Sequence, residues 1–200
     1  MRLLIATSNP NKVREIRPLL SNLPLEIVTL ADIAPIPEPQ ETHATFWENA
    51  RQKAFAYSRA TGLMVVAEDS GIEIAALNGE PGVYSARFLG LDVSYPARFA
   101  EIHRGLASQP DASRDARFVT ALAVVRGEEV LFETEATIDG EIADTPRGEH
   151  GFGYDPIFFY RPLGKTTAEL TLEEKAAVSH RARAFRDFAL WARVSLRLSA

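Results

Sequence analysis

The segment Leu3-Leu-Ile-Ala-Thr-Ser-Asn-Pro10 joins a short apolar run directly to the start of a helix. The run from Leu3 to Thr7 predicts a buried strand, and Asn9 followed by Pro10 is typical of a helix cap with proline in the first turn. A strand that feeds a helix is the basic unit of an α/β protein. This segment therefore sets the first expectation for the fold.

The rest of the chain continues the same mixture of elements. Apolar residues at helical spacing predict helices up to about 20, over 45–60, over 94–106 and over 178–198. Threonine and glutamate three residues apart, at 45–48 and 171–174, predict capping boxes at helix starts. Apolar runs predict strands over 25–30 and 63–67, which 72–75 can continue, and a hairpin of 117–125 with 130–138. We expect one α/β domain with a mixed sheet over residues 1–200.

The composition bounds the kind of protein. A chain of 200 residues with 46% hydrophobic side chains can bury a sizeable core. Its net charge of −5 argues against sequence-independent binding of nucleic acid. It has no cysteine, which excludes disulfides and sulfur-based zinc sites, and no apolar run approaches the length of a membrane helix. We expect a cytoplasmic protein that neither spans a membrane nor binds nucleic acid.

The turn after the first predicted strand has the residues of a phosphate-binding site. Unpaired amides at a helix start attract anions, and a lysine in the first turn is unfavourable there unless an anion is nearby. Plain helix capping explains Asn9 and Pro10 equally well, but it does not explain Lys12. The candidate phosphate ligands are Thr7, Ser8, Asn9, Pro10, Asn11 and Lys12.

Carboxylates follow the strand predicted over 63–67. Glu68 and Asp69 precede Ser70-Gly71, and Glu41 lies upstream beside a proline-rich loop. Oxygen ligands at the end of a strand suit Mg²⁺, which keeps waters for chemistry. The alternative is a simple turn, because Asp-Ser-Gly is common in turns.

The stretch Gly148-Glu-His-Gly-Phe-Gly-Tyr-Asp-Pro156 sets two aromatic residues between glycines. Without a neighbouring Cβ, Phe152 can lie bare against a flat ligand such as a base. The alternative is a tight turn with both rings in the core. Further along, His180 and Arg181 fall in the first turn of the last helix, where they can donate to a carbonyl or simply form a solvated basic face.

Taken together, these motifs resemble the inosine triphosphate pyrophosphatase family, which hydrolyses inosine, deoxyinosine and xanthosine triphosphates to the monophosphate and pyrophosphate. The resemblance covers nearly the whole chain. It rests on the ordered set of 7–12 with Glu15, Glu41, 45–50 with Lys53, 69–71, 81–88, 151–158, Lys175 and 179–181.

The resemblance implies an elongated mixed sheet flanked by helices in two lobes, with the nucleotide in the cleft between them, and a homodimer. It implies that Asp69 acts on the attacking water and binds Mg²⁺ with Glu41. It also implies that residues 7–12 hold the triphosphate and that His180 and Arg181 read the base. The remaining implied contacts to the base, sugar or nucleotide are Ser70, Phe152, Gly153, Tyr154, Asp155 and Lys175.

Two residues depart from the family pattern, and three alternative functions are also compatible with the sequence. His43 stands where many relatives have glycine, and Glu68 where some have a second aspartate. Neither change removes an implied role. The alternatives are a nucleotide-binding regulator without turnover, a nucleic-acid-binding module, and a pyrophosphatase for modified pyrimidine nucleotides.

Overall fold

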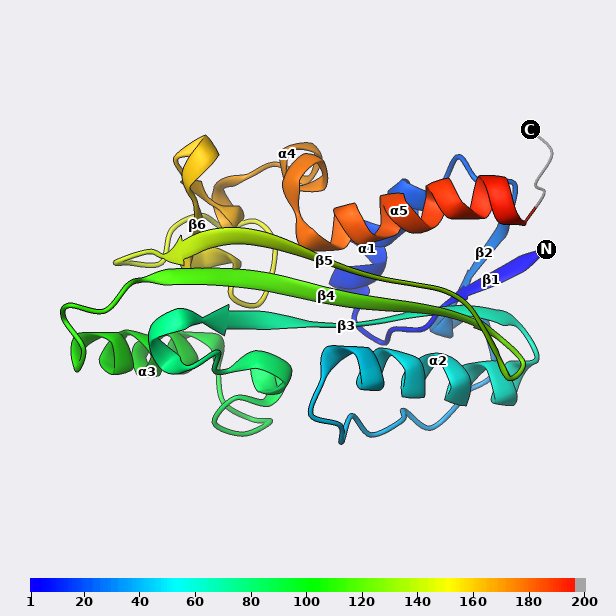
Figure 1. The fold of residues 1–200 in the computed structure, drawn as a ribbon, viewed down its shortest axis with the longest axis horizontal. Helices are drawn as coiled ribbons and strands as arrows, with labels where there is room; N and C mark the ends of the chain where they lie inside the picture. Colours follow the sequence, from blue (N-terminus) through cyan, green and yellow to red (C-terminus); the bar gives the residue numbers. More distant parts are fainter. Residues whose placement is uncertain (197–200) are drawn as a thin grey trace. The chain divides into compact units, whose positions relative to one another are not determined.

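The computed structural model describes residues 1–196, which include seven strands. The strands are β1 (Arg2–Ile5), β2 (Glu26–Thr29), β3 (Met64–Ile74), β4 (Asp115–Arg126), β5 (Glu129–Ile142), β6 (Phe158–Tyr160) and β7 (Lys165–Thr166). They form one sheet in the order β2-β1-β3-β4-β5-β6-β7 (Figure 1). β1 is parallel to β2 and β3, whereas β6 is antiparallel to β5 and β7. The predicted mixed sheet is confirmed.

The helices are α1 (Pro10–Leu20), α2 (Phe46–Thr61), α3 (Tyr95–Ala107), α4 (Leu172–Val178) and α5 (His180–Ser195). Three of the helices in the described residues, α1, α2 and α4, begin where the capping residues predict them. Asn9 caps α1 and Thr45 caps α2, each by accepting a backbone N–H, and Thr171 with Glu174 forms a complete capping box on α4. Short 3₁₀ helices span Leu30–Asp32, Ala75–Leu77, Gly82–Arg87, Asp155–Ile157, Arg161–Leu163 and Thr167–Glu169. The helix predicted over 178–198 is interrupted at Ser179, and its predicted end at Leu198 lies outside the described residues.

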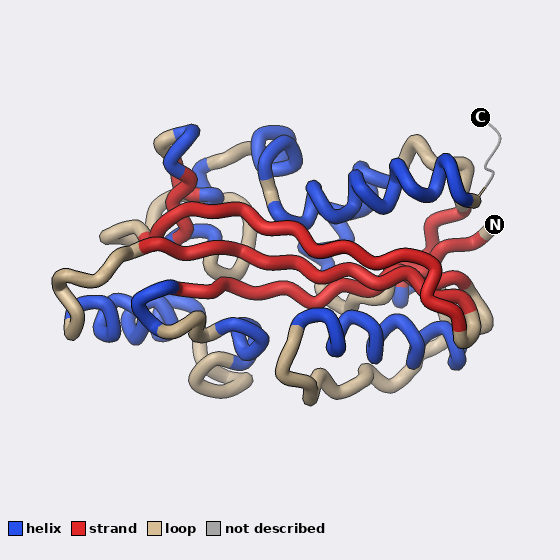
Figure 2. Tube along the Cα trace, viewed as in Figure 1, coloured by secondary structure: helices blue, strands red, loops and turns tan. Residues whose placement is uncertain are grey.

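The chain divides into two compact units, and β3, β4 and β5 each contribute residues to both. The first unit comprises Met1–Asp69, Thr120–Ala136 and the chain from His180 onward. In it, α1 and α5 pack together on one face of the strands, while α2 covers the other face (Figures 1 and 2). Its main core consists of buried apolar side chains that include Leu3, Ile16, Val66, Leu122, Phe185 and Phe188.

The second unit comprises Ser70–Val119 and Thr137–Ser179. Its core joins the C-terminal part of β3 to α3 and to the ends of β4 and β5 that lie in this unit. The buried side chains there include Ile72, Ile102, Phe118, Ile138, Tyr154 and Phe158. The expected cleft between two lobes stays a prediction.

One predicted boundary was wrong. The sequence predicts a strand over 63–67 that ends before Glu68, but β3 is a single strand from Met64 to Ile74. Glu68 and Asp69 therefore lie inside the strand, and both are buried. Acidic residues have low strand propensity, but here the pairing of β3 within the sheet overrides that preference. Among the described residues, no helix combines the length and hydrophobicity needed to cross a membrane.

Candidate active site

The turn between β1 and α1 is held by its own side chains. The Asn9 side chain accepts a hydrogen bond from the backbone N–H of Asn11 at 2.9 Å, and the Thr7 hydroxyl accepts one from the N–H of Asn9 at 3.2 Å. The Ser8 hydroxyl donates to the carboxylate of Glu38, on the proline-rich loop, at 3.0 Å. Pro10 occupies the first turn of α1. The turn is thus preformed at a helix N-terminus, and phosphate binding there stays a prediction.

Lys12 points from the first turn of α1 to an anion supplied by the protein itself. Its Nζ lies 3.4 Å from Oε1 of Glu68, and the side chain is 16% exposed. Burial lowers the pKa of Lys12, with Glu68 opposing that effect. The sequence predicted that an anion near Lys12 must offset the helix dipole, and Glu68 is such an anion.

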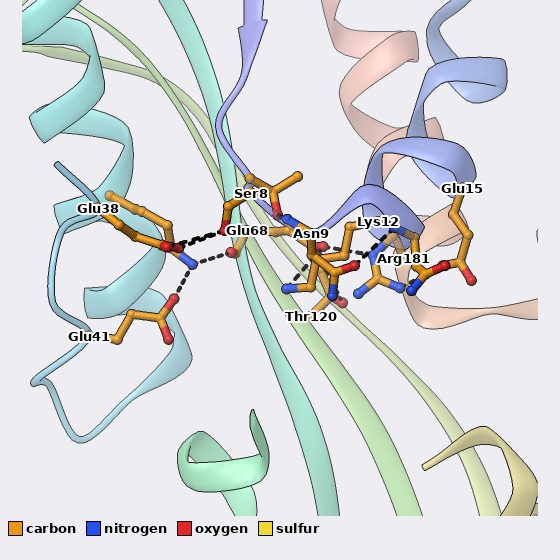
Figure 3. Close-up of polar contacts among 12 residues, drawn as sticks. Ser8, Asn9, Lys12, Glu15, Glu38, Glu41, Glu68, Thr120 and Arg181 are labelled. Atoms are coloured by element: carbon orange, nitrogen blue, oxygen red, sulfur yellow. Dashed lines mark hydrogen bonds and ion pairs between the residues drawn. The ribbon is translucent and has the colours of Figure 1, made fainter. Parts of the chain in front are cut away.

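Glu68 lies at the centre of a buried group of charges (Figure 3). Its Oε1 accepts a hydrogen bond from Nε of Arg181 at 2.7 Å, and its Oε2 lies 3.4 Å from the Thr120 hydroxyl. Burial alone would raise the pKa of this carboxyl group, but the charges of Arg181 and Lys12 outweigh burial and lower the pKa to about 2. The carboxylate is therefore ionised at neutral pH.

Arg181 follows His180 in the first turn of α5, as predicted, and both side chains are buried. Arg181 donates through Nη1 to Glu15 at 2.6 Å in addition to its bond with Glu68. Burial opposes its charge, but the two carboxylates more than compensate and raise its pKa. The guanidinium is thus fixed between α1 and β3, and its predicted contact with a base stays a prediction.

Asp69 is the next residue of β3, and it is 5% exposed. Its Oδ2 accepts a hydrogen bond from Nδ2 of Asn49, on α2, at 2.9 Å. Burial raises the pKa of Asp69, and the nearby carboxylate of Glu41 raises it further, while Lys53 lowers it. Glu41 and Asp69, the two predicted metal ligands, each contact a residue of α2: Glu41 is paired with Lys53, and Asp69 is bonded to Asn49.

Lys53 and Asn49, both on α2, contact Glu41 and Asp69 respectively. The ammonium of Lys53 forms an ion pair with Glu41 and donates to the backbone carbonyl of Glu68 at 2.9 Å. Asn49 also accepts from the backbone N–H of His43 at 3.0 Å, so it anchors the loop after Glu41. The loop uses the backbone of His43 for this contact, and the exposed side chain at that position is not part of it.

The residues present fit a small divalent cation. No three acidic, histidine or cysteine side chains within residues 1–196 are arranged to hold a metal by themselves. Mg²⁺, however, is commonly held by one or two carboxylates together with phosphate oxygens of the substrate. Asp69 and Glu41 would supply those carboxylates. In this structure the cation that contacts Glu41 is the ammonium of Lys53.

A second group of predicted residues meets in the second unit around Asp155. This buried carboxylate accepts from the backbone N–H of Phe152 at 2.7 Å, from the Thr167 hydroxyl at 2.8 Å and from Nζ of Lys175 at 2.5 Å. The Lys175 ammonium also lies 5.1 Å from the centre of the Phe152 ring, a cation–π contact. Asp155 and Lys175 therefore fix the position of a partly exposed aromatic ring.

Gly151, before Phe152, allows this arrangement. It has a φ of +73°, and a Cβ at this position would overlap the Asp155 carboxylate. Gly153 also has a positive φ, of +65°. The two glycines thus permit both the turn and the close approach of the carboxylate, as glycine does where a side chain would obstruct the backbone.

Tyr154 belongs to the core of the second unit. The residue is 4% exposed, and its ring meets that of Tyr95 edge to face, with 5.3 Å between the ring centres. Its hydroxyl donates a hydrogen bond to the backbone carbonyl of Ser85 at 2.9 Å. Its side chain therefore supports the turn from the core, and its part in substrate binding stays a prediction. Ser70, the first residue of this unit, is partly exposed on β3.

Sequence reasoning identified most of these residues but missed some of their partners. Asn49 and Lys53 are four residues apart on the buried face of α2, among Phe46 and Ala50. Polar residues at helical spacing on an apolar face are a signal that could have found Asn49. Thr120 and Thr167 follow no such pattern, because only the folded chain brings them to Glu68 and Asp155.

The amino-acid sequence is similar to those of named enzymes over most of its length. It is 49% identical to the dITP/XTP pyrophosphatase of Syntrophobacter fumaroxidans over 91% of this chain and 78% of that protein. It is 46% identical to the dITP/XTP pyrophosphatase of an Exiguobacterium species over 93% of this chain and 94% of that protein.

Solved structures have the same fold. A HAM1 protein from Coxiella burnetii is 35% identical with a TM-score of 0.89, covering 96% of this chain and 98% of that one. A nucleoside-triphosphatase, dITP/XTP pyrophosphatase, from Mycobacterium abscessus is 43% identical with a TM-score of 0.74, covering 98% and 100%. The sequence profile of the Ham1 family matches residues 3–191. The chain therefore belongs to the Ham1 family, which confirms the family expected from its motifs.

Proposed function

We propose that this chain hydrolyses non-standard purine nucleoside triphosphates, namely ITP, dITP and XTP, to the monophosphate and pyrophosphate. Relatives that are 42–49% identical over most of the chain are named dITP/XTP pyrophosphatases, which supports this assignment. The observation that carries it is that Lys53 contacts both Glu41 and the backbone carbonyl of Glu68, the residue before Asp69, while Lys12 from the first turn of α1 contacts the Glu68 carboxylate.

The proposed hydrolysis divides among these residues by charge. Asp69, oriented by Asn49, accepts a proton from the attacking water. Lys12 and the amides of the β1–α1 turn stabilise the charge that gathers on the pyrophosphate leaving group. Burial raises the pKa of Asp69, and Lys53, which forms an ion pair with the Glu41 carboxylate, opposes that rise. Mg²⁺ bound to Asp69 and Glu41 would neutralise phosphate charge and lower the pKa of a bound water.

Base recognition is proposed separately for the donors of the first unit and for the aromatic ring of the second. Hypoxanthine and xanthine carry a carbonyl where adenine carries an amino group, so a donor from His180 or Arg181 favours the first two and meets another donor in adenine. The ring of Phe152, held by Asp155 and Lys175, offers a platform for stacking. The proposal therefore assigns selection of the purine base to a few side chains that the fold holds in place.

The same proposal covers the assembly and the compartment. We propose a homodimer, as the family resemblance implies, acting on the nucleotide pool of the cytoplasm. The absence of cysteine is consistent with a reducing compartment. Light scattering coupled to size-exclusion chromatography would give the mass, with 22.1 kDa expected for one chain and twice that mass for the dimer.

The test is release of pyrophosphate in the presence of Mg²⁺. We expect kcat/KM for ITP, dITP and XTP to exceed that for ATP and GTP by at least about tenfold, and chelation of the metal with EDTA to abolish turnover. Release of single phosphate, equal rates on all purines, or full activity in EDTA would each contradict part of the proposal.

A further inference from the structure

The buried charges around Glu68 connect the two functions proposed for this unit, phosphate binding and base reading. We infer that Glu68 is a positioning residue that determines base specificity, because its buried carboxylate accepts a hydrogen bond from the guanidinium of Arg181 with the same oxygen that contacts Lys12 (Figure 3). The inference rests on the proposed function, in which Arg181 reads the base and Lys12 contacts the phosphates.

The geometry places both cations on the same atom. Oε1 of Glu68 lies 2.7 Å from Nε of Arg181 and 3.4 Å from Nζ of Lys12. The side chains of Glu68 and Arg181 are 2% and 3% exposed, so water does not screen their interaction. A displacement of this oxygen would therefore move Arg181 first, because its contact at 2.7 Å is a hydrogen bond and the contact with Lys12 at 3.4 Å is a longer ion pair.

The guanidinium of Arg181 is fixed at two points. Glu68 accepts from Nε and Glu15, on α1, accepts from Nη1. Two charge-assisted hydrogen bonds set the plane of the guanidinium and not only its distance. Loss of the Glu68 bond would remove one of the two carboxylate contacts that set this plane.

The cluster is balanced in charge. Two cations, Lys12 and Arg181, face two anions, Glu15 and Glu68. Replacing Glu68 by a neutral residue leaves one uncompensated positive charge in a buried place, which destabilises the arrangement of the cations. Because both oxygens of Glu68 face protein groups, the residue acts on the base through Arg181 and is not a catalytic residue.

The experiment compares Glu68→Gln with wild type by kcat/KM on ITP and ATP and by inhibition with inorganic tripolyphosphate, which has no base. We expect the ITP-to-ATP ratio to fall by at least about tenfold, the effect of losing a charge-assisted hydrogen bond. Inhibition by tripolyphosphate should not weaken, because the bound phosphates supply the anion that Lys12 loses with Glu68. Glu68→Asp keeps the charge and should retain most of the ratio.

Glu73→Gln is the matched control. Glu73 lies on the same strand and is paired with Arg117 at 2.7 Å, but the pair is exposed to solvent and lies in the second unit. Neither readout should change in this variant. An unchanged ITP-to-ATP ratio in a folded Glu68→Gln protein would overturn the inference, as would a parallel loss in the ratio and in tripolyphosphate binding.

A double-variant cycle tests whether Glu68 acts through Arg181. The ratio in Glu68→Gln/Arg181→Ala should equal that in Arg181→Ala alone, because no guanidinium remains to be positioned. Independent, multiplying losses would contradict the inference. A wild-type protein without preference for ITP would overturn the proposed function and this inference with it.

A folding failure would not leave the question open. If Glu68→Gln does not fold, Lys12→Met/Glu68→Gln removes one cation with one anion and keeps the cluster neutral. Its ITP-to-ATP ratio is then compared with that of Lys12→Met alone. The same fall supports the inference, and an unchanged ratio overturns it.

Discussion

At the scale of single residues, Asp69 is the side chain whose loss should affect chemistry more than binding. In Asp69→Asn the amide can still occupy the place beside Asn49, but it cannot accept a proton from water. We expect kcat for ITP to fall at least about a hundredfold while the Kd for IMP changes little. Steady-state kinetics and calorimetry would measure the two quantities. Asp139→Asn, an exposed position on β5, serves as the control, and near-normal turnover of Asp69→Asn would refute the assigned role.

Gly151 tests whether Asp155 needs its close approach to the backbone. In Gly151→Ala the new Cβ overlaps the Asp155 carboxylate and the residue keeps an unfavourable positive φ. We expect a loss of roughly 1–3 kcal/mol in the free energy of unfolding, together with a higher KM for ITP. Urea unfolding and kinetics would measure them.

Gly164→Ala is the matched control for that prediction. Gly164 has a φ of +62°, and nothing lies within 4 Å of an added Cβ. The same conformational cost should appear in stability, but KM should stay unchanged. If both variants shifted KM equally, the effect would not come from Asp155.

At the scale of elements, the capping box of α4 should matter because the helix is short and carries Lys175. α4 has seven residues, and Thr171 and Glu174 satisfy its first backbone groups. We expect Thr171→Ala to lower the free energy of unfolding by about 0.5–2 kcal/mol and to raise KM for ITP through Lys175. Chemical denaturation and kinetics would show both effects.

Ser94 provides the control for the capping prediction. It occupies the N-cap of α3 but makes no side-chain capping hydrogen bond. Ser94→Ala should therefore change the free energy of unfolding by no more than about 0.5 kcal/mol. An equal loss in both variants would mean that the Thr171 box contributes nothing specific.

The helices could be predicted more accurately than the strand that carries the site. Caps such as Asn9 and Thr45 are local signals, because a helix bonds within its own segment. A strand bonds to its neighbours, so the extension of β3 through Glu68 and Asp69 depends on strands that are distant in sequence. The two carboxylates, which the sequence predicts to follow the strand, are therefore buried inside it.

At the scale of the whole molecule, the core of the first unit should provide much of its stability. Phe188 on α5 is fully buried and packs near Phe132 and Trp191. We expect Phe188→Ala to lower the free energy of unfolding by roughly 3–5 kcal/mol, measured by urea denaturation. Leu190→Ala, two residues along the same helix but 68% exposed, should change it by no more than about 0.5 kcal/mol. If both variants lost a similar free energy of unfolding, Phe188 would not be a core residue.

The sequence alone determined the class of fold, the caps of α1, α2 and α4, and the family, because these depend on local patterns and on the order of motifs. Only the tertiary structure decided the partners of the charged residues. The helix dipole makes an anion near Lys12 necessary, but nothing in the local sequence identifies that anion as Glu68, which lies 56 residues further along the chain. Likewise, Arg181 meets Glu15 and Glu68 only when α5 packs beside α1 and β3. Charge pairing acts through space, so folding had to bring these residues together before their roles could be distinguished.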